Sequence, residues 1–414
     1  MSYFQQTKAG GYKVFIRKVN TLVDRIFIIT SAIWAIPCVL IIRLLRPFIL
    51  IRVGSIRSNR IGHFGIDAGM QWAERQNHNH KIIDLYWLEE PVSNKQWATM
   101  VCRNFLTFSW VSHLGRWNRL IPGGKVHYRP SSVTNSRDIN GIMEEYNIQF
   151  EFLPEEMDKG RLWLKEQGWK EGEPFVCLLV RDSEYLDSDI LHSDSYNYEY
   201  HSYRDSDIDT YIKAIEWLAS KGVWVLRMGK SMKKQISSSH TKIVDYAFCP
   251  EKTDLLDIWL FANCDLCIST GSGPDMISDV YRKPLLILNY LPLTHVFSWS
   301  NAVHVPKRLY YKKQAGTLLS CSEYLDNGHL GSEDYRRHDI DIVDLTPSEI
   351  LNAVQERWKR IEGTWVDSIE DNGLQRKFWN IALCNNNFIK INEFIHPDSC
   401  LATTFLRENT GWLE

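Results

Sequence analysis

The chain has 414 residues, of which 44% are hydrophobic and 24% charged, and its net charge is −2 at pH 7. This is the composition of an ordinary globular protein that is long enough for two domains, which excludes a disordered or fibrous chain. Nine scattered cysteines, an odd number, indicate reduced thiols rather than a disulfide framework. Nucleic-acid binding is not expected, because the basic excess is confined to one end of the chain.

The N-terminal segment, residues 1–46, is both basic and hydrophobic. Ten Lys and Arg residues stand among the first 60 residues, against Asp24 alone. The most hydrophobic window of the chain is Ile26–Ile42, whose 17 residues are the lower limit for a spanning helix and are interrupted by Pro37. We expect this segment to hold the protein at the cytoplasmic face of the inner membrane, as a peripheral, re-entrant or single-span anchor. A buried core helix is the alternative.

Strands and helices then alternate, which predicts parallel sheets with crossover helices. The expected elements of the first series, in residues 47–170, are strands at 48–53 and 81–88 and helices at 66–77, 94–105 and 154–168. The second series, in residues 171–345, has expected strands at 175–180, 224–228, 243–247, 264–269 and 284–289 and helices at 207–221, 255–262 and 275–281. The fold class is therefore α/β, with two Rossmann-like domains facing a cleft.

Residues 346–414 form a C-terminal segment that we expect to pack back on the N-terminal domain. It begins with a helix at 346–363, for which Thr346 is the cap, Pro347 the first residue and Glu349 the capping-box acid.

The loop after the expected strand at 264–269 is the main candidate for ligand binding. Its glycines permit a sharp turn and close backbone approach, and Pro274 suits the first turn of the helix that follows. A strand, a small-residue loop and a helix N-terminus together favour a phosphate-bearing ligand, although a plain tight turn has the same pattern. The residues assigned to this site are Ser269, Thr270, Gly271, Ser272, Gly273 and Asp275.

Cations follow neighbouring strands of the same half. Arg181 ends one strand, Arg227 lies at the end of the next, and Lys230 comes just after it. Open α/β sheets bind ligands at the carboxyl ends of their strands. We therefore expect these side chains to contact the phosphate of the bound ligand. A surface cation or a structural ion pair is the alternative.

The polar loop before the helix at 207–221 adds His201, Tyr203 and Arg204, which offer hydrogen bonds for a phosphate or for sugar hydroxyls. An exposed capping loop is the alternative.

Two familiar phosphate motifs are excluded by spacing. Six residues separate Gly222 from Gly229 before Lys230, where a P-loop has four. The loop Gly271-x-Gly273 has Met276 where a dinucleotide fingerprint has its third glycine.

A reaction at a hydroxyl group needs a side chain that can accept its proton, and the N-terminal half offers candidates. Asp67 and His63 are four residues apart on one helical face, so we assign Asp67 as the base and His63 as its orienting partner. Helix capping is the alternative role for both.

Several segments resemble one family of bacterial surface-polysaccharide glycosyltransferases of the GT-B type, and more distantly the heptosyltransferases of lipopolysaccharide synthesis. They are Ile51-Arg52-Val53-Gly54, Arg60-Ile61-Gly62-His63, Val180-Arg181-Asp182, the stretch from His201 to Ile208, Arg227-Met228-Gly229-Lys230, the stretch from Ser269 to Asp275, and Thr404-Phe405-Leu406-Arg407.

The resemblance implies transfer of a sugar from a nucleotide-sugar to a lipid-linked or polysaccharide acceptor, without a metal or other cofactor. Asp205-x-Asp207 leaves a metal as second choice. An enzyme like the nucleotide-sugar 2-epimerases and a non-catalytic, membrane-anchored sugar-binding protein are the other hypotheses.

Overall fold

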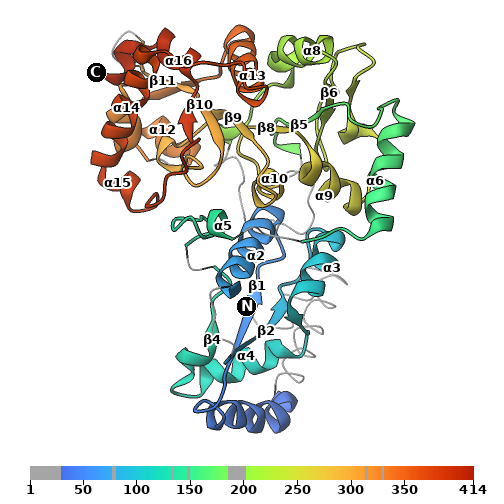
Figure 1. The fold of residues 1–414 in the computed structure, drawn as a ribbon. Helices are drawn as coiled ribbons and strands as arrows, with labels where there is room; N and C mark the ends of the chain where they lie inside the picture. Colours follow the sequence, from blue (N-terminus) through green and yellow to red (C-terminus); the bar gives the residue numbers. More distant parts are fainter. Residues whose placement is uncertain are drawn as a thin grey trace, which may run out of the picture.

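The computed structural model describes residues 29–76, 81–132, 134–146, 150–184, 202–312, 316–328 and 331–414. Two parallel sheets make up most of the molecule, a small one in the narrow lower part of Figure 1 and a large one in the broad upper part. The expected α/β class with parallel sheets is confirmed. Residue His201, one of the candidate ligands, lies outside the described residues.

The first sheet has the order β3-β2-β1-β4 and is parallel throughout. Its strands are β1 (Leu50–Ile56), β2 (Ile82–Leu88), β3 (Leu106–Thr107) and β4 (Tyr128–Arg129). One face packs on α2 (Ile61–Gln76) and α3 (Lys95–Asn104), and the other on α4 (Val111–Leu120) and the helix of residues 29–44. The sequence pattern missed α4, because its start has no side-chain cap.

The helix of residues 29–44 covers most of the hydrophobic window expected at the N-terminus. Its buried positions, Ser31, Ala35 and Val39, follow one another at helical spacing and pack on α4. In the described part of the chain, no helix has both the length and the apolar character needed to cross a bilayer.

The second sheet has the order β14-β10-β9-β8-β5-β6-β7, and every pair of neighbours is parallel. Its strands are β5 (Phe175–Leu179), β6 (Trp224–Arg227), β7 (Ile243–Val244), β8 (Leu266–Ser269), β9 (Leu285–Tyr290), β10 (Ala302–Pro306) and β14 (Cys400–Leu401). Apart from β14, the chain order along the sheet reverses between β5 and β8, as in a doubly wound fold.

Both faces of the second sheet are covered, so its strands are mainly apolar. Alternate side chains of β5 enter different cores, with Cys177 and Leu179 on one face and Val176 and Leu178 on the other. The first face packs on α6 (Pro154–Glu166), α9 (Asp254–Asn263) and α10 (Asp275–Val280), and the second on α8 (Ile212–Ser220) and α13 (Pro347–Ile361). The expected Thr346 capping box of α13 is confirmed.

The remaining elements are short or lie in the tail. They are α5 (Ile142–Glu145), β11 (Arg308–Tyr311), β12 (Thr317–Leu318), α11 (Cys321–Asp326), α12 (Ser332–Arg337), β13 (Ile340–Val343), α14 (Ile369–Cys384), α15 (Asn386–Ile389) and α16 (Thr403–Glu408). We expected residues 346–414 to return to the N-terminal domain. The segment adds β14 to the second sheet, where Cys400 and Leu401 pair with β10. It also contacts the N-terminal part, where the Phe394 N–H donates to the Ile139 carbonyl.

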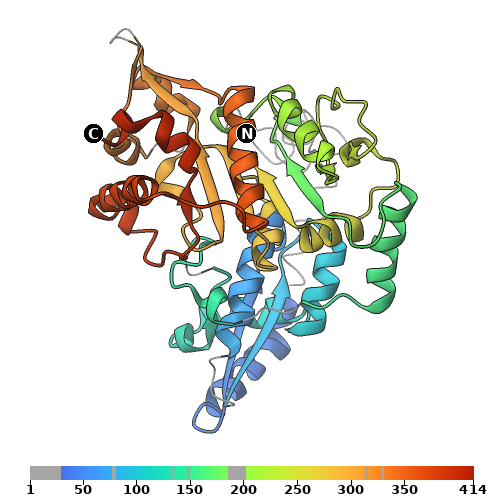
Figure 2. The same ribbon diagram turned by 45° about the horizontal axis from the view of Figure 1, so that its top comes forward.

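The two sheets are joined by direct contact between α2 and α10, visible in both ribbon views (Figures 1 and 2). A Cβ atom on Gly62 would lie 2.7 Å from the Cα atom of Gly273, and one on Gly65 would lie 3.1 Å from Ile277. One hydrophobic core contains Phe64 and Trp97 from the first part together with Ile277 from the second. The expected cleft between the domains is therefore closed where these helices meet.

We expect Gly62→Ala to lower the free energy of unfolding by about 1–3 kcal/mol, because its new methyl group would press on backbone that cannot move aside. Urea unfolding measures this. Gly373→Ala is the matched control: it lies within α14 with nothing within 4 Å of the added methyl, and should raise the same free energy by about 0.5–1 kcal/mol. If Gly62→Ala and the unaltered protein had the same free energy of unfolding, α2 and α10 would not be tightly packed at this position.

Candidate functional site

The reversal of chain order in the second sheet creates a crevice at the carboxyl ends of β5 and β8. The loops after these strands leave in opposite directions, which is where doubly wound sheets bind their ligands. Arg181, just after β5, donates its backbone N–H to the Thr270 hydroxyl, just after β8, at 3.1 Å. Two of the sequence-predicted site segments thus meet at this switch point.

The loop from Ser269 to Asp275 is held by its own side chains. The Asp275 carboxylate accepts hydrogen bonds from the Ser269 hydroxyl at 2.7 Å and from the Ser272 backbone at 2.9 Å. The Gly271 N–H donates to the Ser269 hydroxyl at 3.0 Å. Burial raises the pKa of Asp275 to about 7, against the opposing effect of the Ser269 hydrogen bond. The backbone N–H groups of Gly271 and Ser272, which we expected to bind phosphate, therefore already donate hydrogen bonds within the loop.

Glycine is required at position 271 for two reasons. Its φ of +72° lies in the left-handed region, and a Cβ atom there would come within 2.3 Å of the Tyr290 ring. Gly273 meets α2 instead, at Gly62. The glycines of this loop thus serve the contact with Tyr290 and with the first domain.

Two arginines lie at the crevice. The Arg181 side chain pairs with Asp205 at 3.1 Å, and Arg204 donates a hydrogen bond to the Gly271 carbonyl. Burial, and then the nearby charge of Arg204, lower the pKa of Arg181, which is evidence that the two cations are close together. Such a pair suits a ligand with more than one negative charge.

Lys307 is a third cation at this edge, and the sequence analysis did not select it. It follows β10 directly, and its ammonium donates to the Asp205 carbonyl at 2.6 Å and pairs with Asp344 at 2.7 Å. Burial lowers the pKa of this lysine, with Asp344 opposing the shift. Lys307 could have been found from the sequence as a cation at the end of a buried strand, which is how Arg181 was selected.

The other predicted donor ligands lie farther along the sheet edge or in the core. Arg227 is buried at the end of β6, where it pairs with Asp245 at 3.2 Å and lies over the Phe248 ring. Lys230 is exposed beyond it. Tyr203 is buried, with its ring 5.4 Å from that of Tyr335.

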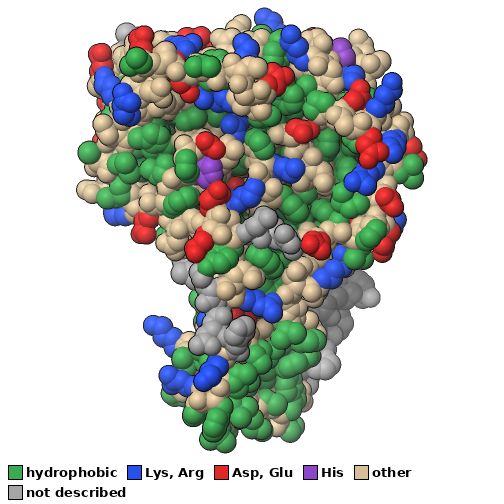
Figure 3. All heavy atoms as spheres, viewed as in Figure 1, with side chains coloured by type: hydrophobic (Ala, Val, Ile, Leu, Met, Phe, Trp, Pro, Cys, Tyr) green, Lys and Arg blue, Asp and Glu red, His purple; other side chains and the backbone are tan. Residues whose placement is uncertain are grey.

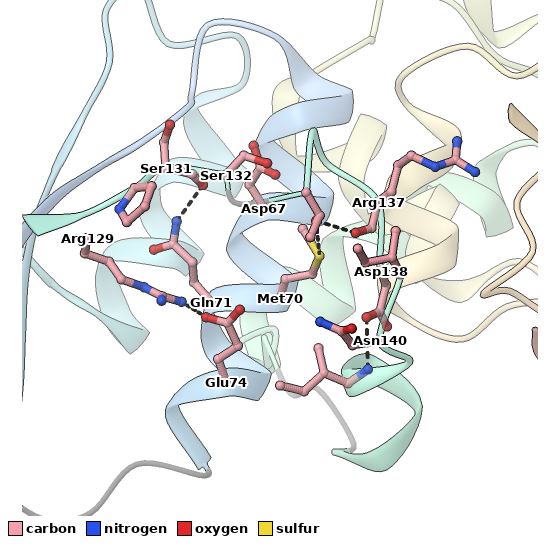
Figure 4. Close-up of a pocket in the computed structure, with 14 residues that line it drawn as sticks. Asp67, Met70, Gln71, Glu74, Arg129, Ser131, Ser132, Arg137, Asp138 and Asn140 are labelled. Carbon is pink, nitrogen blue, oxygen red and sulfur yellow. Dashed lines mark hydrogen bonds and ion pairs between the residues drawn. The ribbon is translucent and has the colours of Figure 1, made fainter. Parts of the chain in front are cut away.

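On the first domain, a small pocket lies between α2 and the segment after β4 (Figure 4). Polar side chains line most of it: Asp67, Gln71, Glu74, Arg129, Ser131, Ser132, Thr134, Asp138 and Asn140. Arg129 pairs with Glu74 at one end, and Asp67 lies beside Ser132 at the other. The pocket thus offers hydrogen-bond partners to a small polar group.

Asp67 is fully buried, and neither of its carboxylate oxygens has a hydrogen-bond partner among the described residues. Burial raises the pKa of this carboxyl to about 6, while the nearby Ser136 and Ser132 hydroxyls lower it. Such a buried acid is costly without a partner, which marks it as a functional candidate.

His63 lies one turn before Asp67, and its Nδ1 atom is 2.6 Å from the Ser136 hydroxyl oxygen. Burial, Arg57 and Arg60 together lower the pKa of this imidazole to about 4, so it is neutral at pH 7. The ring is therefore bonded to Ser136, and no direct hydrogen bond joins it to Asp67.

Arg137 connects the pocket with the second domain. Next to Ser136 in the chain, it points away from the pocket (Figure 4) and donates to the carbonyl oxygens of His295 and Val296 at 3.2 and 2.8 Å. After burial, the charges of Arg137 and Arg204 lower the pKa of His295, to about 4. Arg137 thus ties the segment after β4 to the loop of His295 and Val296 in the second domain.

A metal site is not evident in the ranges that the structure describes, where no group of three His, Cys, Asp or Glu side chains is arranged to hold an ion.

No family model matches the chain, and no curated protein matches it. Similar solved structures include a glycosyl transferase family 9 protein from Veillonella parvula, 10% identical, with a TM-score of 0.42 over 63% of this chain and 86% of that one. The Escherichia coli ADP-heptose lipopolysaccharide heptosyltransferase II is 11% identical, with a TM-score of 0.39 over 75% of this chain and 100% of its own.

A third similar structure is the iron-containing dodecameric glycosyltransferase TibC from enterotoxigenic E. coli, 11% identical, with a TM-score of 0.36 over 76% of this chain and 78% of that chain. The heptosyltransferases that the sequence resembles are thus also among its structural neighbours. Likenesses at these scores carry no argument about activity, which must come from the side chains of this chain.

The Asp67 pKa leads to a prediction for stability. Between the ordinary value of 3.8 and the raised value of about 6, the folded protein binds more protons at this group than the unfolded chain, so stability falls as pH rises through this interval. Over the same pH interval, we expect the free energy of unfolding of Asp67→Asn to rise by about 3 kcal/mol relative to that of the unaltered protein. Urea unfolding across the pH range measures it, and the exposed Asp158→Asn is the control. A pH-independent difference for Asp67→Asn would contradict the raised pKa.

Proposed function

We propose that this chain is a glycosyltransferase that moves a sugar from a nucleotide-sugar to an acceptor hydroxyl. The observation that carries the proposal is the pairing of two features across the contact of α2 with α10. One is the cationic switch-point crevice of Arg181 and Arg204. The other is the buried carboxylate of Asp67, which has no hydrogen-bond partner within the described ranges. A crevice that attracts a diphosphate, together with a buried carboxylate on the helix that contacts α10, supports displacement at a sugar carbon.

In the proposed reaction the donor diphosphate binds at the carboxyl ends of β5 and β8. Arg181, Arg204 and Lys307 would neutralise the charge that develops on the leaving nucleoside diphosphate, which is the role that a divalent metal has in other transferases. We therefore propose that the transfer is independent of a metal.

Asp67 is the proposed base for the acceptor. A carboxyl with a pKa of about 6 is largely ionised at neutral pH and can still accept a proton from a hydroxyl in the transition state. The acceptor oxygen would form the new bond to the anomeric carbon as its proton moves to Asp67 and the nucleoside diphosphate departs. Neutral His63 would hold the Ser136 hydroxyl beside the carboxylate.

The proposed acceptor is a lipid-linked or polysaccharide glycan of the cell surface, at the cytoplasmic face of the inner membrane. The polar pocket beside Asp67 supports a sugar hydroxyl acceptor, since it combines carboxylate, amide and hydroxyl side chains. The basic, hydrophobic N-terminus supports proximity to anionic lipid.

Donor binding is tested on the full chain with UDP-, GDP-, CMP-, dTDP- and ADP-sugars by thermal shift and calorimetry. We expect one nucleotide class to stabilise the protein. Arg181→Gln and Arg204→Gln should each weaken its binding roughly 10- to 100-fold, because a hydrogen bond to a charged group contributes about 1.5–3 kcal/mol. Arg161→Gln, on the exposed side of α6, is the control. No stabilisation by any nucleotide would refute the transferase proposal.

The role of Asp67 is tested with the donor identified in this way and a membrane-extracted glycan acceptor. We expect Asp67→Asn to lower the rate of transfer by about 10²–10⁴-fold while donor affinity is retained, because only proton removal is lost. EDTA should leave the rate unchanged. Donor epimerised without any acceptor would favour the epimerase alternative, and an active Asp67→Asn variant would exclude this carboxylate as the base.

A further inference from the structure

The narrow end of the molecule exposes apolar side chains from two separate segments. In the helix of residues 29–44 and the turn after it, Ile33 is 80% exposed and Leu44 and Phe48 each 76%. Around α4, Leu106, Phe108, Trp110 and Leu120 are exposed as well. Figure 3 shows hydrophobic side chains gathered over this end, with Lys and Arg side chains beside them. We call residues 29–48 and 106–120 together the apolar end.

Tertiary contacts fix this exposure. The helix of residues 29–44 packs on α4 through Ala35 and Val39, and the Trp117 indole donates to the Ser31 hydroxyl at 3.1 Å. The Arg43 guanidinium donates to the carbonyl oxygens of Asn118 and Ile121 at 3.0 and 2.9 Å. The helix is thus held by one face, and its opposite face is directed outward although it is apolar. Exposed apolar side chains that gather on one surface mark a binding surface.

Aromatic rings lie where the two segments meet. The Trp34 and Trp110 rings are 6.3 Å apart in an edge-to-face arrangement, and Phe108 stacks on Trp110 with the ring centres 5.6 Å apart. Trp rings at the boundary of an apolar surface are typical of the interface between lipid headgroups and acyl chains.

The charge around the apolar end is of one sign. No Asp or Glu occurs between Asp24 and Asp67, or between Glu90 and Asp138. These stretches include the apolar end, and exposed cations stand within or next to it at Arg46, Arg116, Arg119 and Lys125. An apolar face with cations and without acids is complementary to an anionic bilayer.

We propose that the apolar end is a composite membrane-docking surface for an anionic lipid bilayer, built jointly by residues 29–48 and 106–120. The second segment is part of the surface because its aromatic rings continue the exposed face of the first helix. Docking does not depend on the glycosyltransferase proposal, since lipid binding requires neither donor nor acceptor.

The experiment is sedimentation of the full chain with vesicles of phosphatidylglycerol and phosphatidylcholine in equal parts, or of phosphatidylcholine alone. We expect binding to the anionic vesicles. The double variant Phe108→Ser and Trp110→Ser should weaken it at least about tenfold, because two buried aromatic contacts with lipid are lost. Arg116→Glu with Arg119→Glu should weaken it about fivefold or more per cation and abolish the preference for anionic lipid.

Matched controls remove similar side chains elsewhere. Val366→Ser with Ile369→Ser replaces two apolar residues that are 83% and 90% exposed near α14, and Lys159→Glu with Arg161→Glu reverses two exposed cations on α6. Both pairs should bind vesicles as the unaltered protein does. Urea unfolding of each variant checks its fold, and the charge variant retains every apolar contact.

Three outcomes would overturn the proposal. Unchanged vesicle binding by the aromatic variant would mean that the N-terminal segment alone reaches the lipid. Equal binding to both vesicle types would exclude recognition of anionic lipid. A dimer in analytical ultracentrifugation that the aromatic variant dissociates, without vesicle binding, would show that a second copy covers the apolar end.

Discussion

The backbone contact between α2 and α10 determines how the rest of the molecule is arranged. Gly62 and Gly273 have no side chains, so the starts of the two helices can touch, and a core that includes Phe64 and Ile277 closes around them. This contact joins two sheets that would otherwise be separate α/β units. It also sets Asp67, on α2, across the junction from the crevice between β5 and β8.

Electrostatic neighbours distinguish the two sides of this junction. On the crevice side, burial and then the charge of Arg204 lower the pKa of Arg181, so the site is prepared for an anion. The α2 side has a carboxyl whose pKa is raised by burial and an imidazole whose pKa is lowered. Acid–base chemistry near neutral pH requires groups in one site whose pKa values are shifted in opposite directions.

Strand β1 relates this site to the apolar end. It starts at Leu50, directly after the exposed turn at Phe48, and ends at Ile56, from which residues 57–60 lead to α2. Seven residues at ~3.3 Å each span roughly 20 Å. A membrane-held acceptor would therefore have to extend a polar portion about this far from the lipid to reach the junction, which suits a glycan more than a bare headgroup.

The sequence alone was sufficient for the parallel α/β class, for seven of the fourteen described strands and for the Thr346 cap, because apolar runs and capping residues act locally. It also predicted that Arg181 and Thr270 lie at the same edge of the second sheet, since the carboxyl ends of parallel strands meet there. It did not predict that Asp275 would bond its own loop, that Arg137 would bridge the domains, or that Trp110 would meet Trp34. Those facts depend on contacts between residues far apart in the chain, and only the packing of α2 on α10 and of the N-terminal helix on α4 decides them.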